Sequence, residues 1–218
     1  MGENVIIKAV IFDFDGTIID TESIWFEVYQ EILKETYQME LPLEEFAKSI
    51  GTTDEQFFQY IENQTGKKID QQDLEKLATE RFLAKKGILA VREGVKEKLS
   101  EAKVLGYKIG LASSSSREWV EGFLRQFDLW DYFSVIKTKE DVVNVKPDPA
   151  LYIKTLEALQ VEPEEALAIE DSLNGALAAI EAGITCIVIP NQVTAFLNFH
   201  EKAIRSETFF DFSFEQIK

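Results

Sequence analysis

Short apolar runs alternate with helical patterns over most of the chain. Four of these runs are rich in Val, Ile and Ala and predict buried strands. They are 9–12, 108–112, 166–169 and 185–189, and a further candidate is 134–136. The helical patterns between them are 94–105, 118–127, 149–159 and 173–182. Because strands alternate with helices, the pattern predicts an α/β fold with a doubly wound parallel sheet and right-handed crossovers.

The segment 21–87 interrupts this alternation. It contains helical patterns and no convincing strand. The predicted helices are 22–37, 43–50, 55–65 and 71–85. Because this segment follows the first predicted strand directly, we interpret it as an inserted helical domain. The remaining residues, 1–20 and 88–218, then form the α/β core.

Composition narrows the classes of partner. The chain has 218 residues, 45% of them hydrophobic, and a formal net charge of −16. A surface this acidic repels the phosphates of nucleic acids and anionic membranes, so neither is expected as a partner. No apolar run has the length of a membrane span or the form of a signal peptide, which favours a cytoplasmic protein. Nothing in the pattern demands an oligomer, and we expect a monomer or a weak homo-oligomer.

The counts of cysteine and histidine restrict the chemistry further. Cys186 is the single cysteine, which rules out an internal disulfide or a cysteine-rich metal site. His200 is the single histidine, which rules out a metal site built from several histidines. Acid–base chemistry in this chain is therefore expected to depend on carboxylates.

Charged and hydroxyl residues follow the predicted strands. They are Asp13 and Asp15 after the first strand, Ser113 and Ser114 after the second, Lys146 before the helical pattern 149–159, and Glu170 and Asp171 after the strand 166–169. In parallel sheets, ligands bind beyond the carboxyl ends of the strands, so these side chains are expected to converge. Carboxylates gathered there would repel one another unless a cation joined them, and oxygen ligands favour Mg²⁺. Such a site suits a phosphoryl group.

The order of these residues resembles a known family. Asp13-x-Asp15-Gly16-Thr17, then Ser113, then Lys146-Pro147 and Glu170-Asp171 resemble the four motifs of the haloacid dehalogenase superfamily. Within it, the chain is similar to the β-phosphoglucomutase-like phosphatases and phosphohexomutases, whose helical cap matches 21–87. The resemblance covers essentially the whole chain.

The resemblance implies a role for each motif residue. Asp13 would be the nucleophile that forms an aspartyl-phosphate, and Asp15 would be the general acid and base. Lys146, Ser113 and Ser114 would bind the transferring phosphate. Magnesium would be held by Asp13, the backbone carbonyl of Asp15, and Asp171, with Glu170 in support.

The predicted cap is expected to contribute residues that determine substrate specificity. Two residues are candidates for recognising the leaving group of the substrate: Thr52 in the loop after Gly51 and Arg81 on the last cap helix. Sugar phosphomutases of this group carry a histidine early in the cap and an arginine in the first cap loop. This chain has no histidine in 21–25, and the loop 51–55 carries acids. The leading hypothesis is therefore a magnesium-dependent phosphatase that acts on a small phosphorylated metabolite such as a sugar phosphate.

Three other hypotheses stay open on the sequence. The nearest is a phosphohexomutase. From a different class, a receiver-like signalling domain also uses carboxylates, a hydroxyl and a lysine on a parallel sheet. The last is a scaffold without catalysis.

Overall fold

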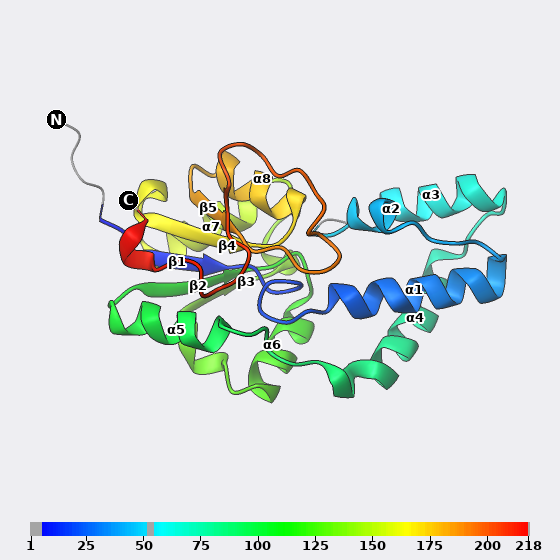
Figure 1. Ribbon diagram of the computed structural model, residues 1–218, viewed down its shortest axis with the longest axis horizontal. Helices are drawn as coiled ribbons and strands as arrows, with labels where there is room; N and C mark the ends of the chain where they lie inside the picture. The colour runs from blue at the N-terminus through cyan, green and yellow to red at the C-terminus, as the bar shows by residue number, and fades with distance from the viewer. Residues whose placement is uncertain (1–5, 52–54, 218) are drawn as a thin grey trace.

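A parallel sheet forms the centre of the protein (Figure 1). The computed structural model describes residues 6–51 and 55–217. Within them, the sheet has the strand order β3-β2-β1-β4-β5-β6, and each neighbouring pair is parallel. The strands are β1 (Ala9–Phe12), β2 (Lys108–Ala112), β3 (Val135–Lys137), β4 (Ala166–Glu170), β5 (Thr185–Val188) and β6 (Ile204–Arg205). Their carboxyl ends therefore meet at one edge.

Helices cover both faces of the sheet. They are α5 (Val95–Val104), α6 (Arg117–Gln126), α7 (Ala150–Leu159) and α8 (Leu173–Glu181). Side chains alternate along a strand, so Val10 and Phe12 pack in one apolar cluster with residues of α5 and α6. Ala9 and Ile11 pack in a second cluster with residues of α7 and α8. This two-sided burial explains why the strands appear in the sequence as continuous apolar runs.

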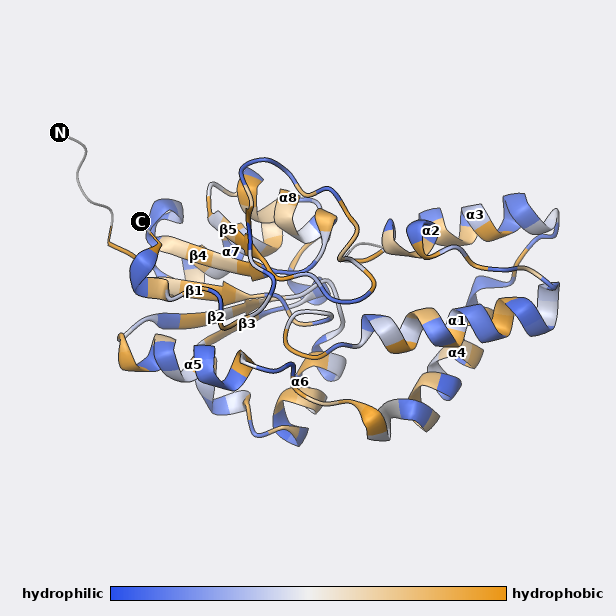
Figure 2. Cartoon of the chain, in the orientation of Figure 1, coloured by the Kyte–Doolittle hydropathy of each residue, from blue (hydrophilic) through white to orange (hydrophobic). Residues whose placement is uncertain are grey.

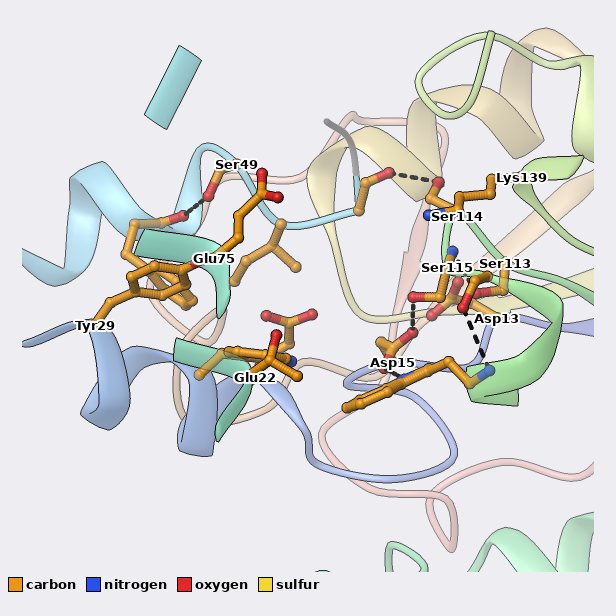
Figure 3. Close-up of a pocket in the computed structure, with 17 residues that line it drawn as sticks. Asp13, Asp15, Glu22, Tyr29, Ser49, Glu75, Ser113, Ser114, Ser115 and Lys139 are labelled. Atoms are coloured by element: carbon orange, nitrogen blue, oxygen red, sulfur yellow. Dashed lines mark hydrogen bonds between the residues drawn. The ribbon is translucent and has the colours of Figure 1, made fainter. Parts of the chain in front are cut away.

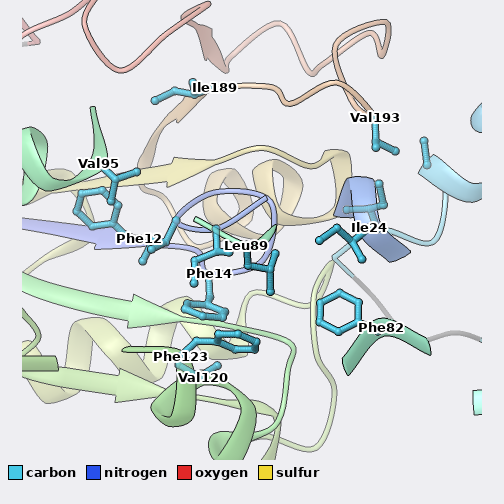
Figure 4. Packing of buried hydrophobic residues seen from close by; sticks show 14 of the residues in the cluster. Phe12, Phe14, Ile24, Phe82, Leu89, Val95, Val120, Phe123, Ile189 and Val193 are labelled. Carbon is cyan, nitrogen blue, oxygen red and sulfur yellow. The ribbon is translucent and has the colours of Figure 1, made fainter. Parts of the chain in front are cut away.

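Four helices connect β1 to the rest of the core. They are α1 (Glu22–Tyr37), α2 (Leu43–Ala47), α3 (Glu55–Thr65) and α4 (Gln71–Lys85). Figure 1 shows them beyond the end to which the arrow of β1 points. Aromatic rings join them, with Phe57 4.9 Å from Tyr29 and 5.8 Å from Phe46 between ring centroids. Figure 4 follows the same buried cluster from Phe12 to Phe82, so these helices share an apolar core with the sheet.

The predicted α/β fold is confirmed, and most predicted elements agree with the structure to within a residue at each end. One helix is shorter than predicted: the pattern 43–50 forms a helix only as far as Ala47. The hydroxyl of Ser49 donates to the carbonyl of Phe46 at 2.7 Å, and Gly51 has a positive φ of 79°. These features turn the chain away from the helix axis, because positive φ is favourable mainly for glycine.

The strand β6 has no counterpart in the prediction. Ile204 pairs with Ile187 of β5, yet both residues of β6 are exposed. A two-residue edge strand with no apolar run has no periodic signal to detect. Short 3₁₀ helices also occur between the main elements and after β6. They are η1 (Lys86–Ile88), η2 (Trp130–Tyr132), η3 (Lys139–Asp141), η4 (Pro163–Glu165) and η5 (Phe214–Gln216).

The distribution of hydropathy follows from this architecture. Figure 2 shows the central strands coloured toward hydrophobic, whereas the helices α1 and α3 alternate hydrophilic and hydrophobic faces. Among the helices in residues 6–51 and 55–217, none combines the length and the apolar character that a bilayer crossing requires.

Candidate active site

Backbone hydrogen bonds fix the side chains at the carboxyl edge of the sheet. Asp13 directly follows β1, and its N–H donates to the carbonyl of Ile169 in β4 at 2.9 Å. Ser113 directly follows β2, and its N–H donates to the carbonyl of Lys137 in β3 at 3.0 Å. The ladder thus continues one residue past each strand. Asp13 and Ser113 are held as rigidly as the sheet itself.

A buried ion-pair cluster lies behind Asp13. Lys146 Nζ is 2.5 Å from Asp13 Oδ1 and 2.7 Å from Glu170 Oε1, and it also donates to the carbonyl of Ala112 at 2.7 Å. Lys146 is 1% exposed and Glu170 0%, so both charges have left water. The hydroxyl of Tyr152 donates to the same Glu170 oxygen at 2.6 Å. Lys146 is therefore the shared counter-ion of two buried carboxylates, and such pairing is the condition for tolerating a buried charge.

Burial shifts the titration of these groups. Burial and the charge of Glu170 raise the pKa of Asp13 to about 7, although Lys146 opposes that shift. Burial acts against the charge of Lys146, but the charges of Asp13 and Glu170 outweigh it and raise the pKa of the lysine. Burial and the charges of Asp13 and Glu170 raise the pKa of Asp171 well above its usual value. The site holds more negative charge than one lysine balances.

Three carboxylates are arranged as ligands for a cation. Asp13, Glu170 and Asp171 each offer an oxygen within 4.8 Å of the others, and all three are buried. An all-oxygen donor set suits Mg²⁺ rather than a softer metal. Both oxygens of Glu170 already accept hydrogen bonds, from Lys146 and Tyr152 at Oε1 and from the backbone N–H of Asp171 at Oε2. Glu170 is therefore better placed to support the other two carboxylates than to bind a metal directly.

The turn after β1 is pressed against Asp171. Gly16 has φ +78°, and a Cβ atom there would lie 2.2 Å from Asp171 Oδ2. The hydroxyl of Thr17 donates to Asp171 Oδ1 at 3.2 Å, and Asn191 Nδ2 donates to Oδ2 at 2.8 Å. Only glycine allows this backbone conformation and this close approach together. The Gly16-Thr17 pair thus brings the chain segment of Asp13 and Asp15 up to Asp171.

Asp15 has a separate environment. Its Oδ1 accepts hydrogen bonds from the Thr21 hydroxyl at 2.9 Å and from Trp119 Nε1 at 2.9 Å. Its Oδ2 accepts from the Ser115 hydroxyl at 2.5 Å. Burial raises the pKa of Asp15, and the hydrogen bonds from Ser115, Trp119 and Thr21 oppose the shift because they stabilise the carboxylate.

A cavity of about 340 Å³ opens in front of Asp13 and Asp15 (Figure 3). Its core side is formed by the loop after β2, and its far side by residues of α1, the chain after α2, and α4. The described lining residues are Asp13, Asp15, Glu22, Trp25, Tyr29, Phe46, Ser49, Ile50, Gly51, Glu75, Thr79, Ser113, Ser114, Ser115, Ser116, Trp119 and Lys139. The cavity has the size of a small metabolite and connects the core with the inserted helices.

The predicted core residues meet around this cavity. Asp13, Asp15, Ser113 and Ser114 line it, and Lys146 contacts Asp13 from behind. The Ser114 hydroxyl donates to the carbonyl of Gly51 at 2.9 Å and so ties the loop after β2 to the inserted segment.

Neither predicted cap residue is among the described residues that line the cavity. Thr52 lies outside the described residues. Arg81 is absent from the described lining of the cavity, and its Nη2 pairs with Glu35 Oε2 at 2.6 Å. The role of Arg81 in contacting the substrate therefore stays a prediction, and in this structure a carboxylate on the neighbouring helix α1 pairs with its charge. The sequence predicts the helix that carries Arg81 but not which neighbouring side chain Arg81 meets.

Several site residues were not predicted. They are Thr21, Trp119, Tyr152, Asn191, Glu22 and Glu75. Thr21 lies beside the first motif, so a local signal exists for it. Trp119 is 104 positions from Asp15 and Asn191 is 20 positions from Asp171, and neither belongs to a motif. Only the fold brings them to the site.

Comparison with known proteins places the chain in a well-populated group. Residues 10–189 match the family described as "Haloacid dehalogenase-like hydrolase". The chain is 48% identical over 203 residues to YhcW of Bacillus subtilis (strain 168), covering 93% of this chain and 92% of that protein. It is 33% identical over 178 residues to the "Phosphorylated carbohydrates phosphatase" of Thermotoga maritima, covering 81% of this chain and 82% of that protein.

A solved structure has the same architecture. The crystal structure of CbbY from Rhodobacter sphaeroides in complex with phosphate superposes with a TM-score of 0.78 at 32% sequence identity. The match covers 94% of this chain and 95% of that one. The similarity therefore includes the sheet and the inserted helices together.

Proposed function

The chain belongs to the haloacid dehalogenase-like hydrolase family, and we propose that it is a magnesium-dependent phosphatase of a small phosphorylated metabolite. The observation that carries this proposal is the buried cluster of Asp13, Lys146 and Glu170, in which Asp13 lines the cavity next to Asp15. The relative from Thermotoga maritima, named for phosphorylated carbohydrates, supports a sugar phosphate as the substrate class.

The first chemical step belongs to Asp13. A carboxylate oxygen of Asp13 attacks phosphorus in line, the bond between phosphorus and the leaving oxygen breaks, and an aspartyl-phosphate forms. Asp15 donates a proton to the leaving oxygen, so an alcohol departs rather than an alkoxide. Lys146 holds Asp13 Oδ1 in place, and Ser113 and Ser114 line the position of the phosphoryl oxygens.

The second step returns Asp13 to its starting state. Asp15, now ionised, takes a proton from a water molecule, whose oxygen attacks phosphorus. The bond between phosphorus and Asp13 breaks and inorganic phosphate is released. Asp15 thus serves as acid and then as base, so the mechanism needs no histidine, of which the chain has one.

A magnesium ion fits the donor set described above. Asp13, the backbone carbonyl of Asp15, and Asp171 would hold it, with Glu170 in support. When bound, it would neutralise charge on the phosphoryl oxygens and on the clustered carboxylates.

Removing the metal should affect stability as well as turnover. Phosphate release should stop in EDTA, and Mg²⁺ at about a hundred times its Kd should add about 2.7 kcal/mol of stability. For a chain of this size that corresponds to a rise in Tm of about 5–10 °C, measurable by thermal unfolding. Asp171→Asn should lose most of this rise, whereas the exposed control Asp131→Asn should keep it. A full Mg²⁺ response in Asp171→Asn would contradict the assigned ligands.

We propose the segment 21–87 as the cap that closes over the core 1–20 and 88–218. Its residues Trp25, Tyr29 and Phe46 line the cavity opposite Asp13, where a closed cap would exclude water. We further propose that the protein works in the cytoplasm as a monomer or weak homo-oligomer, without nucleic-acid or membrane partners.

Charge at the cap end of the cavity bears on the choice between phosphatase and phosphohexomutase. Glu22 and Glu75 line that end, and among the described lining residues the one cation is Lys139, which comes from η3 on the core side. A mutase must bind a bisphosphate, whose second phosphate would face the carboxylate of Glu75. The arrangement favours hydrolysis of a monophosphate whose remaining groups are neutral or hydroxyl-bearing.

Glu75→Gln should relax this selectivity. We expect kcat/KM for a hexose bisphosphate, relative to the matching monophosphate, to rise about threefold because one repulsive charge is removed. Glu80→Gln is the matched control, since Glu80 is an exposed residue of the same helix that does not line the cavity. An equal change in both variants would show that net charge, rather than the position of Glu75, sets the preference.

The function itself is tested by a screen of phosphate release. Purified protein is incubated with a panel of sugar phosphates and other phosphorylated metabolites, with Mg²⁺ or EDTA. We expect magnesium-dependent release of phosphate from at least one monophosphate. Isomerised sugar phosphate without net release, from β-glucose 1-phosphate with a trace of bisphosphate, would favour the mutase.

A further inference from the structure

The side chain of Trp119 makes a polar contact that the proposed mechanism has not used. Trp119 lies in the first turn of α6, and its backbone N–H donates to the Ser116 hydroxyl that caps the helix, at 3.3 Å. Its Nε1 donates to Asp15 Oδ1 at 2.9 Å, and the residue lines the cavity. Trp119 therefore contacts the proposed general acid directly.

The chemistry of the indole makes this contact directional. Thr21 and Ser115 also contact Asp15, but a hydroxyl group can either donate or accept a hydrogen bond. The N–H of an indole can only donate. Oδ1 of Asp15 must therefore remain an acceptor while Trp119 is in place. The oxygen left to carry the transferred proton is Oδ2, which faces the Ser115 hydroxyl in the cavity wall.

The ring of Trp119 is held by aromatic neighbours on three helices. Its centroid is 5.1 Å from that of Phe82 in α4, 6.0 Å from Trp25 in α1 and 4.9 Å from Phe123 in α6. Trp25 in turn stacks on Phe82 at 4.3 Å. Figure 4 shows two of these neighbours, Phe82 from the inserted helices and Phe123 from the core. Because the ring is packed between the core and the inserted helices, its N–H has one direction in which to point.

We propose that Trp119 is a positioning residue that holds Asp15 with Oδ2 toward the leaving group. The proposal rests on the proposed function, since it assigns Trp119 a part in the proton transfer by Asp15. Without the N–H, the carboxyl of Asp15 can rotate or carry its proton on the wrong oxygen. Proton donation to a poor leaving group then suffers most, whereas binding of the phosphate does not depend on it.

The test compares leaving groups. An alkyl phosphate needs a proton on its leaving oxygen, whereas 4-nitrophenyl phosphate leaves readily without one. In Trp119→Phe, kcat/KM for a sugar or alkyl phosphate should fall on the order of tenfold more than kcat/KM for 4-nitrophenyl phosphate. Trp130→Phe is the matched control, because Trp130 stacks with Arg125 at 3.9 Å and is not among the described residues that line the cavity.

A second variant removes the N–H and keeps the ring. Replacing Trp119 with β-(3-benzothienyl)alanine puts sulfur in place of N–H in a bicycle of nearly the same shape. This variant should show the same selective loss for alkyl phosphates as Trp119→Phe, and it decides the matter if Trp119→Phe fails to fold. Wild-type selectivity in the benzothienyl variant, or equal losses for both substrates, would overturn the role of Trp119. Absence of phosphate release from the wild-type protein would instead overturn the proposed function.

Discussion

Asp13→Asn should lower kcat by at least about 10⁴-fold, because a neutral amide cannot act as the nucleophile that accepts the phosphoryl group. Folding should survive the change. An asparagine keeps the shape of the side chain, and its carbonyl oxygen can still accept the hydrogen bond that Lys146 donates to Asp13 Oδ1. The measurement is phosphate release in Mg²⁺ from the best monophosphate of the screen, with thermal unfolding of the same samples.

The matched control is Asp131→Asn, which makes the same chemical change at an exposed position of η2. Its turnover should equal that of the wild-type protein. If Asp13→Asn stays within about tenfold of wild type, Asp13 is not the nucleophile and the two-step mechanism is wrong. Turnover of the wild-type protein in the same assay also separates hydrolysis from a receiver-like role, since a signalling domain would show no turnover.

The strands and the core motifs could be predicted because both depend on local sequence. A strand covered on two faces, such as Ala9–Phe12, must be apolar throughout, and parallel strands must end at one edge of the sheet. The residues that follow the strands are therefore expected to lie together from the sequence alone. Gly16 belongs to the first motif and is part of the local signal, and the structure gives the reason for this glycine: a Cβ atom there would collide with Asp171.

The inserted helices were predictable as helices but not in what their polar faces meet. Arg81 lies on a helix that the sequence predicts, but its pairing with Glu35 depends on how α4 packs on α1. The same limit applies to Trp119. Its ring looks in the sequence like one apolar residue on the buried face of α6, and its bond to Asp15 depends on packing across 104 positions of chain. Such contacts follow from tertiary packing, which no local pattern encodes.

Lys146→Met should destabilise the protein by about 3–5 kcal/mol in the presence of EDTA. Lys146 is 1% exposed and is bonded to both Asp13 and Glu170, so its removal leaves two buried carboxylates without a counter-ion. Methionine retains most of the volume of the lysine stem, which keeps the loss of packing small. Urea unfolding measures the change. The exposed Lys154→Met should stay within about 0.5 kcal/mol of wild type.

A second substitution shows whether charge is the cause. Glu170→Gln in the Lys146→Met background removes one of the two uncompensated carboxylates while keeping an acceptor for the hydroxyl of Tyr152. The double variant should therefore be more stable than Lys146→Met alone, and the double-mutant cycle should give a coupling of about 1–3 kcal/mol. If the lysine contributed only packing, the two substitutions would add and the double variant would be the least stable of the series. Recovery would show that Lys146 is needed because the sheet edge concentrates more carboxylates than a protein interior tolerates, and the same excess is what a divalent cation would relieve.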